Sequence, residues 1–189
     1  MMEMTRETAE QSLRDIEEAR RKTRFDADWG GGDLMMILWG AVWTFAFLGS
    51  HYDPEKAGIF WMIGDALGVI GTWAIIYQVN QRVQSQEGQR IGIFWFLLFV
   101  FIFLELAVMH PWDPIQMNAF ICLQVMLAIV VMGLWLEVMG MLLFAGVVTA
   151  FILVGYFLMG SYYNLWMACT GGGAFLGTGL YARYRLRRS

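Results

Sequence analysis

The sequence predicts an all-α membrane protein: a bundle of six transmembrane helices in three consecutive hairpins, preceded by an amphipathic cytoplasmic helix. Of the 189 residues, 58% are hydrophobic and only 15% are charged, whereas a typical soluble domain is about 25% charged. The apolar residues also form long blocks, and a helix of about 20 such residues crosses a bilayer. The charged residues are concentrated outside these blocks.

Residues 1–33 are expected to form a soluble helical arm that ends in a glycine-rich joint. Thr5 can cap a helix, and Leu13 and Ile16 lie on one narrow apolar stripe. A run of cationic residues from Arg20 to Arg24 suits both a helix C-terminus and an anionic membrane surface. Two interpretations remain open. The helix lies against its own bundle, or it docks a partner or a second copy.

The predicted membrane domain covers residues 34–184, and residues 185–189 form a basic tail. The segment Ile115–Leu158 would be about 66 Å long as one helix, twice the hydrocarbon thickness, so it must fold back. Glu137 and Gly140 mark the expected turn. The expected spans are Leu34–Gly49, Ala57–Val79, Ile91–Met109, two within Ile115–Leu158, and Leu165–Tyr181.

The outer turns of the three predicted hairpins resemble one another. The hairpins are 34–80, 91–137 and 138–184. Asp53, Asp113 and Asn164 each stand where a helix N-cap is needed, and Pro54 and Pro114 follow at a position that favours proline. Either each turn meets the same capping need independently, or the chain is an ancient triplication.

The distribution of cations predicts the orientation. The arm holds six Lys or Arg residues, the 80–90 loop two and the tail four, whereas the other side holds only Lys56. Cytoplasmic loops carry this excess of cations. Both termini are therefore expected in the cytoplasm, with the protein in a bacterial inner membrane.

Two acids lie inside predicted spans, Asp65 and Glu105. A carboxylate at that depth costs about 2–3 kcal/mol, and no Lys or Arg within a span can pair with it. Either the acids are structural hydrogen-bonding groups, or they bind a cation, a proton or a small amine. Polar residues at similar depth would complete such a ligand site. They are Thr44, Asn118, Gln124, Thr149 and Thr170.

Glycines at four-residue spacing predict close helix packing. Gly64 and Gly68 lie in the second span, and Gly173 and Gly177 in the sixth. Small residues at this spacing let two helices approach. The alternative is that residues 171–173, all glycine, unwind the last span and expose backbone groups to a ligand.

The sequence does not suggest an enzyme. No catalytic set, phosphate-binding loop or cofactor ligand has the required spacing. His51 and His110, with Asp53 and Asp113, could bind an external metal, but solvated loop residues are the favoured interpretation. No metal, cofactor or nucleic acid is therefore expected.

The segment 15–24, DIEEARRKTR, the glycine joint and the segment 38–43, LWGAVW, carry a family resemblance. They resemble uncharacterised bacterial multi-span membrane proteins with an N-terminal cytoplasmic helix. The resemblance implies the class and no activity. The expected function is a scaffold, regulatory or accessory subunit that acts through its arm on a cytoplasmic partner or as a homo-oligomer. The alternative is a small transporter or channel that uses Asp65 and Glu105.

Overall fold

The computed structural model describes residues 31–80, 86–109, 113–186 and 188, so residues 1–30 of the expected arm lie outside it. Every element in the described part is a helix or a helical turn. The long helices are α2 (Gly32–Tyr52), α3 (Ala57–Asn80), α4 (Gln86–Val108), α5 (Pro114–Trp135), α6 (Met139–Val154) and α8 (Gly173–Leu186). The short elements are η1 (Pro54–Lys56), η2 (Gly155–Met159), η3 (Gly160–Tyr162), α7 (Tyr163–Met167) and η4 (Ala168–Gly172).

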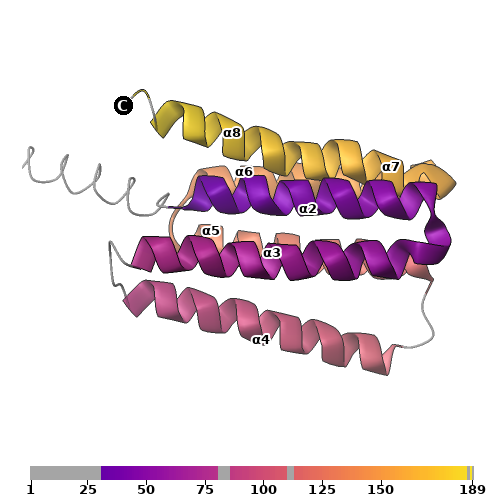
Figure 1. Cartoon of the computed structure of the whole chain (residues 1–189), viewed down its shortest axis with the longest axis horizontal. Coiled ribbons are helices and arrows are strands. Elements are labelled where there is room, and N and C mark those ends of the chain that lie inside the picture. The colour runs from indigo at the N-terminus through magenta and orange to yellow at the C-terminus, as the bar shows by residue number, and fades with distance from the viewer. Residues whose placement is uncertain (1–30, 81–85, 110–112, 187, 189) are drawn as a thin grey trace, which may run out of the picture.

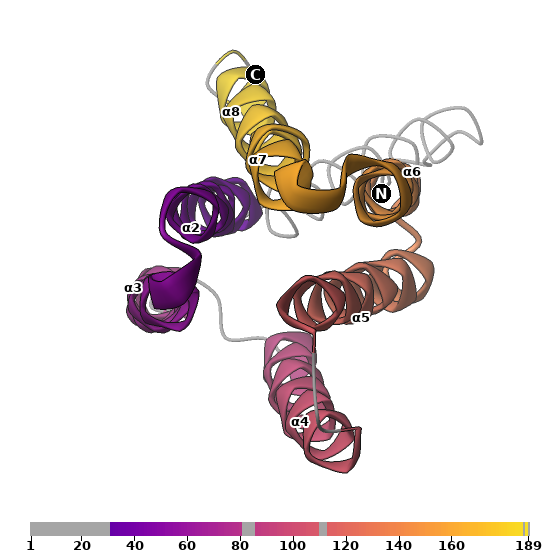
Figure 2. The same cartoon turned by 90° about the vertical axis from the view of Figure 1, so that its right-hand side faces the viewer.

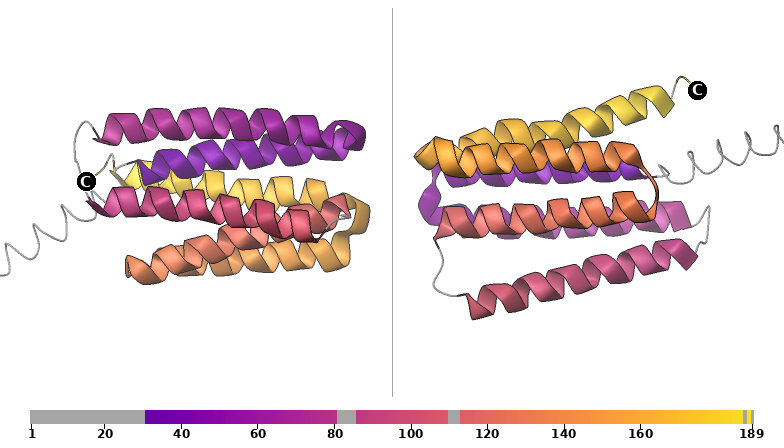
Figure 3. Two further views of the ribbon diagram at one scale, coloured as in Figure 1. Left: turned by 90° about the horizontal axis from the view of Figure 1, so that it is seen from below. Right: turned by 180° about the vertical axis from the view of Figure 1, so that it is seen from behind.

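The helices lie roughly side by side along the long axis of the molecule, and α2 begins at the end where α8 finishes (Figure 1). Seen from its end, the bundle is a curved row that runs from α3 through α2, α7 with α8, α6 and α5 to α4 (Figure 2). The closest neighbours are α2 with α8, α2 with α3, and α5 with α6, as the views from below and behind also show (Figure 3). We call the end that holds η1 and η3 the η1 end.

Five helices of the described part are long and apolar enough to cross a membrane. They are Gly32–Tyr52, Pro54–Gln78, Arg90–Val108, Pro114–Trp135 and Met139–Arg185. The prediction of an all-helical protein with several candidate membrane spans is thus confirmed.

The last candidate, Met139–Arg185, contains a reversal at the η1 end. Gly160 has φ 51° and ψ −122°, a backbone conformation that glycine adopts without steric cost. Elements η2 and η4, on either side of this reversal, are π-helical turns. The glycines at 171–173 therefore do not break the helix, because a wider turn continues into α8.

The predicted turn at Glu137 is confirmed. α5 ends at Trp135 and α6 begins at Met139, and Glu137 between them has a left-handed φ of 57°. The backbone N–H of Val138 donates to the carbonyl of Gly133 at 2.9 Å, which closes the end of α5.

The three expected helix caps differ in outcome. Asp113 caps α5 as predicted, because its side chain accepts from the N–H groups of Ile115 and Gln116 at 3.0 and 2.9 Å. Asp53 precedes η1 but makes no side-chain cap; its carboxylate pairs with Lys56 instead. The expectation for Asn164 is wrong, since it lies inside α7, after the N-cap residue Tyr162.

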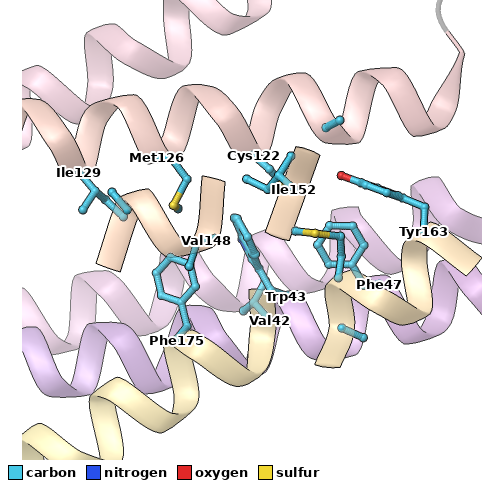
Figure 4. Packing of buried hydrophobic residues seen from close by; sticks show 14 residues of the cluster. Val42, Trp43, Phe47, Cys122, Met126, Ile129, Val148, Ile152, Tyr163 and Phe175 are labelled. Atoms are coloured by element: carbon cyan, nitrogen blue, oxygen red, sulfur yellow. The ribbon is translucent and has the colours of Figure 1, made fainter. Parts of the chain in front are cut away.

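Trp43 of α2 lies at the centre of the buried core (Figure 4). Its ring centroid is 5.0 Å from that of Phe175 and 5.9 Å from that of Phe47. Facing helices fill the space around it with Met126 from α5 and Val148 from α6. The core therefore joins α2, α5, α6, α7 and α8.

The two ends of the curved row contribute little to this core. In the part of α4 whose burial is described, residues 90–108, Ile102 alone is buried, and α4 packs mainly against α5. α3 packs against α2, with the indole of Trp61 reaching the core. Most of the remaining α3 and α4 surface consists of exposed apolar side chains, which suits contact with lipid or another membrane protein.

Candidate functional site

Asp65 lies on α3, eight residues after Ala57 at the start of the helix, and its side chain is exposed. It makes no hydrogen bond or ion pair with the residues that the structure describes. Trp61 is one helical turn away on the same face, and that indole packs at 4.9 Å against Phe47 of α2. Asp65 therefore follows Trp61 along one side of α3, but its own side chain is exposed and has no polar partner among the described residues.

Glu105, in contrast, has a partner on the neighbouring helix. The side-chain amide of Gln124 on α5 donates to Oε2 of Glu105 on α4 at 2.7 Å. Both side chains are half-buried, and Ile102, one turn before Glu105, is buried. Two of the seven residues expected to form a ligand site are thus in direct contact.

The two acids belong to opposite ends of the helix row, since α3 and α4 are its outermost members (Figure 2). No hydrogen bond joins Asp65 to Glu105 in the described part of the chain. A single site containing both carboxylates thus stays a prediction.

Two of the four remaining polar candidates form hydrogen bonds within their own helices. The hydroxyls of Thr44 and Thr170 each donate at 2.8 Å to the carbonyl four residues earlier, at Gly40 and Trp166. Asn118 is buried on α5, only 8% exposed. Thr149 is half-buried on α6.

Two of the four predicted packing glycines lie in helix contacts. A methyl group added at Gly64 would meet Val42 at 3.3 Å, and one at Gly68 would meet the indole of Trp39 at 3.0 Å. The same indole donates to the hydroxyl of Thr72 at 3.1 Å. Gly64 and Gly68 therefore let α3 approach α2.

Gly173 and Gly177 differ from this expectation. Both are exposed, and a methyl group added at either would meet nothing within 4 Å. The close approach of α8 to α2 instead uses Gly40 and Gly179, whose added methyl groups would lie 2.7 Å from the backbone of Leu176 and 2.8 Å from that of Asp33. Neither glycine lies in the predicted four-residue pairs.

Three buried polar atoms were not predicted from the sequence, which marks Asn164 only as a helix cap. Nε1 of Trp61, the hydroxyl of Tyr163 and Oδ1 of Asn164 are buried without a hydrogen-bond partner in the described part of the chain. The other amide atom of Asn164, Nδ2, donates to the carbonyl of Ser50 at 3.4 Å. Aromatic residues near span ends are common, so the sequence gave no reason to select Trp61 and Tyr163.

An ion pair at the opposite end of the bundle was also missed. Nη1 of Arg183, near the end of α8, lies 3.7 Å from Oδ2 of Asp33, in the first turn of α2. An acid beginning one helix and a cation ending its antiparallel neighbour are the sequence signals that could have found it.

His51, in the last turn of α2, has no metal-binding arrangement with the described residues. His51 contacts the rings of Tyr52 and Tyr162, and His110 lies outside the described residues. Among the residues described, no group of three His, Cys, Asp or Glu side chains could hold a metal ion.

Comparison of the chain with protein-family models, with curated proteins and with solved structures found no match. A function can therefore be inferred only from the chemistry of the described side chains.

Proposed function

We propose that the protein is a non-enzymatic, integral inner-membrane subunit that crosses the bilayer six times and serves a scaffold or regulatory role in a membrane complex. Six crossings follow if α6 and α8 are separate spans on either side of Gly160. An even number leaves Gly32 and Leu186 at one end of the bundle (Figure 1). The excess of cations at that end supports a cytoplasmic location for both termini.

The observation that supports a subunit is the unpartnered carboxylate of Asp65. It is exposed within a membrane-spanning helix, where an unpaired acid costs about 2–3 kcal/mol. Exposed Met62, Val69 and Trp73 lie on the same side of α3 as Asp65. A membrane helix of a partner that offers a hydrogen-bond donor would cover both the acid and the apolar surface. The charged arm at 1–33 would add a second contact in the cytoplasm.

Native mass spectrometry of the full chain, extracted with its complex in mild detergent, tests this. We expect Asp65→Ala to release a defined partner, while Leu67→Ala, a matched change on the same helix, retains it. Deleting residues 1–29 should weaken the same complex. If neither the deletion nor Asp65→Ala changes the bound partners of a folded protein, the proposal fails.

A second candidate function is a small transporter or channel for a cation, a proton or a small amine. The contact between Glu105 and Gln124 favours it, because it places an acid among half-buried polar groups within the membrane. In proteoliposomes, Asp65→Asn or Glu105→Gln should then abolish ligand- or proton-dependent flux while the protein still folds. Wild-type flux in both variants would exclude this function.

A further inference from the structure

The η1 end contains three polar atoms that are buried and have no partner among the described residues: Nε1 of Trp61, the hydroxyl of Tyr163 and Oδ1 of Asn164. Tyr163 is 0% exposed. Buried polar groups are almost always hydrogen-bonded, to protein or to a bound molecule. Each unsatisfied group costs about 1–3 kcal/mol, and no bulk water reaches a membrane interior to compensate.

All three side chains contact the last turns of α2, between Phe47 and Ser50. The ring of Phe47 lies 4.9 Å from that of Trp61 and 6.2 Å from that of Tyr163, edge-to-face in both cases. Asn164 follows Tyr163 and bonds to Ser50, one turn after Phe47. The three side chains are therefore neighbours of the same part of α2.

The hydroxyl of Tyr163 points from α7 toward the side of Cys122 and Ile152 (Figure 4). Cys122 is buried on α5, and Asn118, one turn before it, is 8% exposed. Asn118 makes no hydrogen bond with the described residues either. Asn118, on α5, is therefore a fourth polar side chain on this side of the bundle.

The donors and acceptors restrict what could bind. The indole N–H can only donate, the free oxygen of Asn164 can only accept, and the tyrosine hydroxyl can do both. A bound molecule must therefore accept one hydrogen bond and donate another. All three groups are uncharged, so they offer no counter-charge to an ion.

The packing around the Tyr163 ring is tight. A methyl group added at Gly155 would come within 3.2 Å of the Tyr163 ring and 2.6 Å of the Trp166 ring. Tyr163 is thus confined between Gly155 and Phe47. We propose that Trp61, Tyr163 and Asn164 form a buried site for a small neutral molecule with both a donor and an acceptor, the class of water, ammonia, short alcohols and short amides.

Solution NMR of the full chain in lipid nanodiscs, with tryptophan labelled with ¹⁵N in the indole ring, tests this site. Trp61→Phe assigns the Trp61 indole signal by its disappearance. Water is the first probe and acetamide the second. Tyr163→Phe removes the buried hydroxyl, and Tyr162→Phe is the matched control because Tyr162 is exposed.

We expect a magnetisation-transfer peak between the Trp61 indole proton and water that Tyr163→Phe weakens and Tyr162→Phe retains. If instead only acetamide shifts the Trp61 signal, with the same dependence on Tyr163, the site binds an organic member of the class. If neither probe affects the signal in the wild-type protein, the proposal is overturned, whether or not the variants fold.

Thermal unfolding gives an independent readout. Removing a hydroxyl that bonds a ligand should lower the Tm by about 2–4 °C, whereas Tyr162→Phe should leave it unchanged. Removing a hydroxyl with no partner relieves a desolvation cost. A Tyr163→Phe protein as stable as the wild type, or more so, would therefore contradict the proposal.

Discussion

Gln124 on α5 and Glu105 on α4 are joined by a 2.7 Å hydrogen bond from the glutamine amide to the carboxylate. α4 packs mainly against α5, and in residues 90–108 only Ile102 is buried. In a membrane, apolar side chains gain little from meeting each other, because lipid tails are equally apolar. The hydrogen bond between Gln124 and Glu105 therefore contributes a larger part of the free energy that attaches α4 to α5 than it would in water.

Replacing Gln124 with Leu should destabilise the protein by about 1–2 kcal/mol, because it leaves the Glu105 carboxylate half-buried without this partner. The double variant Glu105→Leu with Gln124→Leu should recover part of that loss, since no orphan acid remains. Unfolding by a denaturing detergent, measured for both single variants and the double variant, gives the coupling energy.

Gln116 lies on the same helix, is exposed and has no side-chain hydrogen bond among the described residues, so Gln116→Leu is the control. Additive effects of the changes at Glu105 and Gln124 would show that the hydrogen bond does not contribute to stability.

The sequence located the two intramembrane acids but could not assign their partners. Both needed a partner or water, because no cation exists within a span. Which helices become neighbours is decided by packing around Trp43, and span boundaries carry no information on that. Glu105 accordingly faces Gln124, whereas Asp65 meets no donor in the described part of the chain.

The turns were more predictable than the contacts, because they depend on local chemistry. A 44-residue apolar segment must reverse in a bilayer, and Glu137 lies at the reversal. The Asp-Pro pair at 113–114 has the residue types that begin a helix, and Asp113 caps α5. Asn164 is of the same type, but its side chain bonds to Ser50 across the bundle instead.

Gly179 should tolerate no side chain, in contrast to Gly177 on the same helix. A methyl group at Gly179 would lie 2.8 Å from the carbonyl oxygen of Asp33 and 2.9 Å from the backbone nitrogen of Ile37. Gly179→Ala should therefore separate α8 from α2 and destabilise by about 1–3 kcal/mol. Gly177→Ala should be neutral or stabilising by up to about 1 kcal/mol.

Detergent-induced unfolding of both variants checks this pair. Equal effects would contradict the assignment of Gly179 to the contact. The four-residue spacing of Gly173 and Gly177 identified a helix face made of small residues. Spacing alone does not reveal which face of α8 packs against another helix. In α8 the contact face is the one that contains Gly179.

The ion pair between Asp53 and Lys56 predicts a pH effect at the η1 end. The Lys56 ammonium donates to the carboxylate at 2.6 Å and lowers the pKa of Asp53. The pair contributes above the ordinary pKa of an aspartate and is lost as the pH falls through the lowered value.

Lys56→Gln should raise the pKa of Asp53 toward its ordinary value. An NMR titration of the ¹³C-labelled carboxyl measures this shift, and Glu55→Gln serves as the control beside it. An unchanged Asp53 titration in Lys56→Gln would mean that the ion pair is not populated. The Lys56 side chain is 63% exposed and that of Asp53 is 35% exposed, so solvent screens the ion pair and the change in stability should be too small to measure.

The ion pair between Arg183 and Asp33 should hold the end of α8 against the start of α2. The Asp33 side chain is only 10% exposed, and it lies in the first turn of α2, where free N–H groups favour an anion. Arg183→Gln should cost about 0.5–1 kcal/mol at low salt. The cost stays modest and shrinks as salt is added, because Arg183 is more than a third exposed.

Arg185→Gln is the matched control for this ion pair. The Arg185 guanidinium lies over the Tyr181 ring at 5.9 Å and lies on the same helix end. Hydrogen exchange of the first turn of α2 should increase in Arg183→Gln and stay unchanged in Arg185→Gln. Gly31, directly before this turn, has a left-handed conformation. Loosening the first turn of α2 should therefore also loosen the backbone at Gly31. Equal exchange in both variants would mean that packing at Gly179 alone holds the two helix ends together.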